Sequence, residues 1–165
     1  MLDMVNGQLS ALKVSEAERK EVAQPFVEFI GIDLHNIYFS VFERLLMLKQ
    51  QELTRRKDAA GNTPEAQKVL QSFFDEKADW QREVVRLSYQ QSKPYDLAAN
   101  LRAATPTKML DDKEREIADR FMREVLSLYD GCRAKGGFTS EAEQFYDRYS
   151  DIDGAGAKVK ELFDR

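Results

Sequence analysis

The residues best suited to chemistry in this chain are one histidine, one cysteine and two groups of closely spaced carboxylates. The histidine, His35, lies inside the most apolar stretch of the sequence, GIDLHNIYFSVFERLLML, residues 31–48. A di-iron helical bundle needs Glu-x-x-His pairs on two helices, but Ile32 stands three residues before His35 and no second histidine exists. One histidine and one cysteine also supply too few ligands for an ordinary zinc site. Single-histidine haem ligation remains open, but we predict that no metal or cofactor is bound.

The simplest interpretation of His35 is a core histidine that hydrogen-bonds Glu28, two turns earlier, or a polar group of a neighbouring helix. An alternative is a small-molecule or sensory pocket in which one imidazole lies in an aromatic wall. The residues that would form this pocket are Glu28, His35, Phe42 and Trp80.

The carboxylates suggest a third kind of chemistry, because two acidic helices that face each other can hold Mg²⁺ and bind a nucleotide's phosphates. This arrangement resembles that of the all-α nucleotide pyrophosphohydrolases of the MazG kind, in a few acidic residues only. The ordinary alternative is a solvated face, since many of these acids have a basic residue three or four positions later. The acids concerned are Asp75, Glu76 and Asp79 in one segment and Asp112, Glu116 and Asp119 in another.

Cys132 is predicted near the C-terminus of a helix, where the helix dipole disfavours a thiolate. A Cys132–His35 nucleophile and base pair is therefore not expected. A single cysteine also excludes an internal disulfide framework and is typical of a reducing compartment. The N-terminus lacks a basic region followed by an apolar run, so a cytoplasmic location is expected.

The composition favours one soluble helical domain over residues 1–165, with residues 1–14 as a loosely attached segment. Charged residues make up 33% of the chain and carry a net charge of −4, with acidic and basic residues interspersed. No concentrated basic surface is present, so nucleic acid is not an expected partner.

Helical spacing dominates the sequence and predicts an all-α fold, an irregular up-and-down bundle of three long helices and several short ones. Long helices are expected over about 26–57, from about 64 onward, and over about 108–132. Pro25 predicts a break or kink before the first of these. Capping boxes are expected at Ser15–Glu18 and at Ser140–Glu143.

In residues 31–48 a polar stripe covers about a third of the predicted helix and apolar residues cover an arc of about 200°. The polar stripe argues against a membrane span. One neighbouring helix cannot cover so wide an arc, so the helix is either central in the bundle or shared with a second copy. We therefore predict an interaction surface at Tyr38, Phe39, Phe42 and Leu46.

The function expected from the sequence is a non-enzymatic protein-interaction or regulatory module that binds a protein partner or itself. The small-molecule pocket and the acidic-helix hydrolase are the second and third alternatives.

Overall fold

The computed structural model describes residues 15–89, 95–150 and 155–164, and these residues form helices and no strand. The three long helices are α2 (Glu16–Ala59), α3 (Pro64–Tyr89) and α5 (Asp112–Lys135). The short elements are α4 (Leu97–Ala104), the 3-10 helix η1 (Thr107–Met109), α6 (Ser140–Tyr149) and α7 (Ala155–Phe163). The predicted all-α class is confirmed. The segment predicted to be loosely attached, residues 1–14, lies outside the described residues.

α2 is the longest element, with 44 residues, and is about 66 Å long at roughly 1.5 Å per residue. Ser15 and Glu18 form the predicted capping box at its start. The separate short helix predicted before Pro25 is not formed, because α2 runs continuously through Pro25. Pro25 lies on an exposed part of α2, where water can bond the carbonyl group left without a proline N–H donor.

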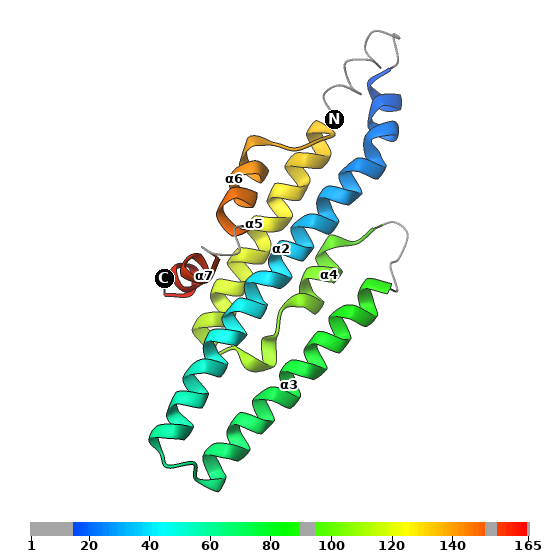
Figure 1. Ribbon diagram of the computed structural model, residues 1–165. Helices are drawn as coiled ribbons and strands as arrows, with labels where there is room; N and C mark the ends of the chain where they lie inside the picture. The colour runs from blue at the N-terminus through cyan, green and yellow to red at the C-terminus, as the bar shows by residue number, and fades with distance from the viewer. Residues whose placement is uncertain (1–14, 90–94, 151–154, 165) are drawn as a thin grey trace.

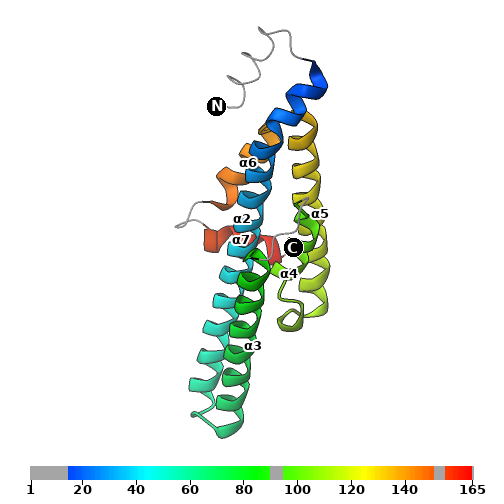
Figure 2. The same cartoon turned by 90° about the vertical axis from the view of Figure 1, so that its right-hand side faces the viewer.

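α2 and α3 form an antiparallel hairpin. Its turn contains Gly61 and Asn62, both in the left-handed region at φ 75° and 58°, and α3 then starts at Pro64 as the sequence predicts. The helices α4 and α5 form a second layer on one side of this hairpin, and α6 and α7 lie on the other side of α2 (Figures 1 and 2). The far end of the hairpin extends beyond the second layer, which Figure 2 shows most clearly.

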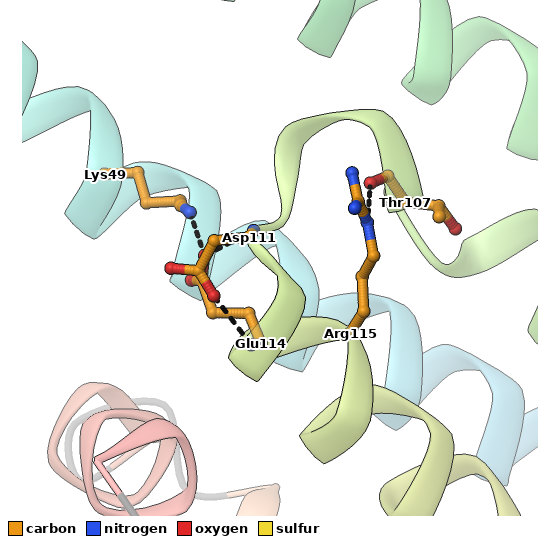
Figure 3. Close-up of polar contacts among 5 residues, drawn as sticks. All are labelled: Lys49, Thr107, Asp111, Glu114 and Arg115. Carbon is orange, nitrogen blue, oxygen red and sulfur yellow. Dashed lines mark hydrogen bonds and ion pairs between the residues drawn. The ribbon is translucent and has the colours of Figure 1, made fainter.

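Polar contacts attach the start of the second layer to the hairpin (Figure 3). Asp111 and Glu114 form a capping box at the start of α5, in which each backbone N–H donates to the other residue's carboxylate, at 3.0 and 2.8 Å. Lys49 of α2 donates to the same Glu114 carboxylate, and Arg115 donates to the Thr107 carbonyl at 3.1 Å. This capping box explains why α5 begins at Asp112 rather than near residue 108.

The start of α6 differs from its prediction by one residue. The capping side chain is that of Thr139, which accepts a hydrogen bond from the Ala142 N–H at 3.2 Å, and Ser140 is already helical. Both residue types cap helices well, so their order along the chain does not distinguish them.

The hydrophobic core is continuous along α2 and includes side chains from all the other α-helices. Its centre is aromatic: the Tyr38 ring lies 5.2 Å from that of Phe121 and 4.9 Å from that of Phe42. Thr105 donates to the Leu101 carbonyl at 2.8 Å, so the 2.6 Å contact between the Tyr38 and Thr105 hydroxyls has Tyr38 as donor. The tyrosine hydroxyl is thus satisfied inside the core.

Candidate functional site

Most of the residues predicted as an interaction surface are buried inside the chain itself. Tyr38, Phe42 and Leu46 are each 0% exposed, whereas Phe39 is half-buried with its ring 5.0 Å from that of Trp80. The prediction of an interaction surface at these residues is therefore wrong, because three of the four have no area to offer a partner.

The reason is that α2 is the central helix of the fold. It contacts α3, α4, α5, α6 and α7, so helices of the same chain cover its wide apolar arc. The first of the two predicted arrangements, a central helix, is the one observed. The apolar arc of α2 is therefore no reason to expect that a second copy of the chain binds there.

The four residues of the predicted small-molecule pocket are not brought together around one cavity. Phe42 lies in the aromatic core, with its ring 5.8 Å from that of Phe163 of α7. Trp80 lines a cavity of about 460 Å³ between α3 and residues 105–109, and Glu28, His35 and Phe42 are not among the residues that line it. The predicted pocket is therefore not present as a single site.

His35 is 9% exposed and lies on the face of α2 between Gly31, one turn earlier, and Phe39, one turn later. Burial lowers the pKa of the imidazole, because a charged ring loses the solvation it has in water, and a hydrogen bond with the Asn36 side chain opposes part of this effect. His35 is therefore a neutral core histidine, and its side-chain partner is Asn36 rather than Glu28 or a polar group of a neighbouring helix, the two partners expected from the sequence.

The depressed pKa of His35 predicts a pH dependence of stability. The unfolded chain has the ordinary imidazole pKa of about 6.5 and binds a proton more readily than the folded chain. Unfolding free energy should therefore be highest above about pH 6.5 and should fall as the pH drops below that value, by at most about 1.4 kcal/mol per pH unit. Denaturant titrations at several pH values between about 7.5 and 5 would measure this slope.

His35→Gln is the control for this titration, because it removes the titrating group and should flatten the profile in that range. The carboxylates of Glu18, Glu52, Glu83 and Asp111 also have lowered pKa values, but they are present in both proteins, so their contribution at the acidic end of the range cancels in the comparison with His35→Gln. They therefore do not interfere. A slope that is the same in wild type and in His35→Gln would show that His35 is not its source.

The two predicted groups of acidic residues do not face each other. α3 packs against α2, α4 and η1, whereas α5 packs against α2, α4, α6 and α7. Asp79 pairs with Arg82 on its own helix, and Asp112 pairs with Arg115 at 3.0 Å. Among the described residues no cluster of three or more His, Cys, Asp or Glu side chains could hold a metal ion. The geometry required by the metal-hydrolase alternative is absent from this part of the chain.

Cys132 lies in the last turn of α5, as predicted, and is 0% exposed. Its sulfur is 3.8 Å from the Thr139 hydroxyl. None of the described helices is both long enough and apolar enough to cross a membrane.

The largest cavity among those described is an open groove of about 670 Å³ along α2. The residues along its floor and sides come from α2, α3 and the α6–α7 region. They are Asn36, Ile37, Ser40, Val41, Glu43, Arg44, Met47, Lys77, Tyr149, Ser150 and Val159. We call this feature the outer groove.

The outer groove combines an apolar floor with charges of both signs. Glu43 accepts a hydrogen bond from the Gln81 amide at 3.0 Å, and Lys77 donates to the Gln50 amide at 3.4 Å. These bonds join α2 to α3 and fix the edge of the groove. A floor of this kind suits an amphipathic segment better than a catalytic reaction, which needs converging titratable groups.

Three of the large apolar side chains that remain exposed lie on α2 and α3, the two long helices that form the outer groove, but outside its lining. Phe29 is 65% exposed and stands two turns before Asn36 on the same face of α2. Phe74 and Val85, at 39% and 52%, share with Gln81 the face of α3 that adjoins the groove. None of these three residues was predicted from the sequence, although Phe and Val at helical spacing on an otherwise polar surface are a usable signal.

Comparison with known proteins adds nothing to this geometry: no family model, curated protein or solved structure matches the chain.

Proposed function

We propose that this protein is a non-enzymatic helical interaction module that binds a protein partner in the outer groove. The observation that carries the proposal is a groove of about 670 Å³ with an apolar floor, on helices that also carry three exposed apolar side chains outside its lining, Phe29, Phe74 and Val85. Exposed apolar side chains beside a concave surface are typical of protein contact sites. An amphipathic helix is the segment that best fits a groove between helices.

A cross-linking experiment tests this proposal in the cells that express the protein. Phe74 is replaced by a photoreactive benzoylphenylalanine, and the control carries the same group at Ser127, an exposed residue of α5. We expect a discrete cross-linked species from position 74 and none from position 127.

Val85→Asp, combined with the photoreactive group at position 74, should reduce the cross-link by about tenfold or more, as expected for a charge placed in an apolar contact that contributes at least about 1.4 kcal/mol. Val69→Asp is the matched control, since Val69 is also on α3 and is 55% exposed, close to the 52% of Val85. The two valines are 16 positions apart and therefore about 160° apart around the helix. Equal cross-linking in both variants and the parent protein would contradict the proposal.

A further inference from the structure

The end of the α2–α3 hairpin, residues 47–79, has no partner layer. We call this segment the arm. No residue of the arm is buried, whereas the preceding part of α2 is buried along most of its length. Its apolar side chains are only half covered or are exposed, including Leu53, Phe73 and Val69. The two helices of the arm bury the side chains that lie between them, but they cannot cover an apolar stripe on the outer side that both helices form. A further helix is needed to cover that stripe.

The uncovered face of the arm continues the face that α4, η1 and α5 cover elsewhere. Lys49 reaches Glu114 in the first turn of α5, so Leu53 and Arg56, four and seven residues later on the same side of α2, lie past the N-terminal start of α5. On α3, Glu76 and Trp80 line the cavity beside residues 105–109. The inner arm face is thus made up of Lys49, Leu53, Arg56, Glu65, Val69, Phe73 and Glu76.

Spacing on α3 supports this assignment. Val69, Phe73, Glu76 and Trp80 follow one another at intervals of four, three and four residues, the spacing of a seam between packed helices. Trp80 is covered, at 9% exposed, whereas Val69, three turns nearer the tip, is 55% exposed. The seam therefore continues past the point where its covering layer ends.

The charges on the two edges of the inner arm face differ in sign. The α2 edge is net basic, with Lys49 and Arg56 against Glu52, which pairs with Arg56 at 2.9 Å, and the α3 edge is acidic, with Glu65 and Glu76. The chain's own second layer already matches this pattern. It presents Glu114 to Lys49 of α2, and Lys108 lines the cavity that contains Glu76 of α3.

We infer that the inner arm face binds one amphipathic helix of a partner protein, which extends the second layer beyond η1. Its apolar side contacts Leu53, Val69 and Phe73. Its acidic edge faces the basic residues of α2, and its basic edge faces the acidic residues of α3. This surface lies on the opposite side of α3 from Val85, so the inference goes beyond the proposed function and stands or fails separately from it.

A second copy of this chain is the less suitable occupant. Parallel arms packed face to face would place the α4–α5 layer of one copy in the space of the other copy's hairpin. Antiparallel arms around a two-fold axis would place α2 against α2 and α3 against α3. Basic residues would then oppose basic residues, and acidic residues would oppose acidic residues, which disfavours that contact.

Designed peptides test the inference with the full-length protein. Each peptide has about 18 residues, enough for partial helicity in water, and a leucine seam. The first carries Glu on one edge and Lys on the other, the second carries Glu on both edges, and the third carries Lys on both. The mixed-edge peptide should bind at least about fivefold more tightly than the other two, because only it forms favourable exposed pairs along both edges.

Three variants make the result specific to the inner arm face. Val69→Asp should weaken mixed-edge binding about tenfold or more, while Ser127→Asp, at an exposed position of α5 outside both surfaces, should leave it unchanged. Glu65→Lys combined with Glu76→Lys makes both edges basic and should shift the preference to the all-Glu peptide. Circular dichroism confirms that each exposed-site variant remains folded.

The inference would be overturned if no peptide bound below about millimolar concentration, or if the peptides bound equally. It would also be overturned if Val85→Asp, rather than Val69→Asp, abolished binding, because that result assigns the peptide to the outer groove. Concentration-dependent dimerisation that Val69→Asp removes would instead identify a second copy as the occupant and contradict the inference.

Discussion

Replacing Phe42 with alanine should lower the unfolding free energy by about 3–5 kcal/mol, the usual cost of removing a fully buried phenylalanine ring. The ring is 0% exposed and lies among aromatic rings from three helices, with Tyr38 on its own helix, Phe121 on α5 and Phe163 on α7. Neighbouring rings anchored on separate helices cannot all move inward, so most of the space would remain as a cavity. Urea denaturation of the purified variant measures the loss.

Phe29→Ala is the matched control, because it makes the same change on the same helix at a side chain that is 65% exposed. Its effect should stay within about 0.5 kcal/mol, as for other surface substitutions. A loss below about 1 kcal/mol for Phe42→Ala would mean that the ring is not part of the core. The same measurement distinguishes a core position of Phe42 from the exposed interaction surface that was predicted from the sequence.

Gly31→Ala should destabilise the protein by about 1–2 kcal/mol, although alanine is the better helix former. A Cβ atom at this position would lie 2.8 Å from Tyr95 Cε1 and 2.9 Å from Tyr129 Cε2. Alanine gains roughly 0.5–1 kcal/mol over glycine within a helix, but overpacking of a filled site costs about 1–3 kcal/mol. The steric effect is expected to dominate, because the two rings lie at 84° to each other and close the site from two sides.

Gly156→Ala, on α7, is expected to change the stability of the protein in the opposite direction. Nothing lies within 4 Å of a Cβ atom added there, so the substitution should be neutral or stabilise the protein by up to about 1 kcal/mol. Thermal and urea unfolding of the two variants can be compared directly. If Tyr129→Leu recovers part of the Gly31→Ala loss in a double-mutant cycle, the ring contact is its cause. A stabilising Gly31→Ala would show instead that Tyr95 and Tyr129 move aside at little cost.

Much of the fold could be predicted from local patterns. The capping box at Ser15, the turn at Gly61 and the start of α3 at Pro64 depend on hydrogen bonds and backbone preferences within a few residues. Such interactions are properties of the segment itself, so the sequence is sufficient to predict them. At Pro25 the sequence predicted a short separate helix or a kink, and the separate helix is not formed because α2 runs on through the proline.

The candidate site could be predicted much less well. The sequence correctly indicated that α2 has more apolar surface than one helix can cover. It was wrong to predict that Tyr38, Phe42 and Leu46 belong to the part of that surface that stays uncovered. These side chains are buried, and the large apolar side chains that are exposed among the described residues are Val22, Phe29, Val69, Phe74 and Val85. Exposure depends on where the other helices end, and the spacing within one helix does not contain that information.

The sequence by itself therefore determined the all-α class, most helix boundaries and the amount of apolar surface to be covered. These follow from interactions between residues near one another in the chain. Only the tertiary structure decided that the chain's own helices cover the centre of α2, and that the second layer stops at η1 and leaves the arm uncovered. That decision depends on contacts between distant segments, such as Lys49 with Glu114 and Tyr38 with Thr105, whose partners no local pattern specifies.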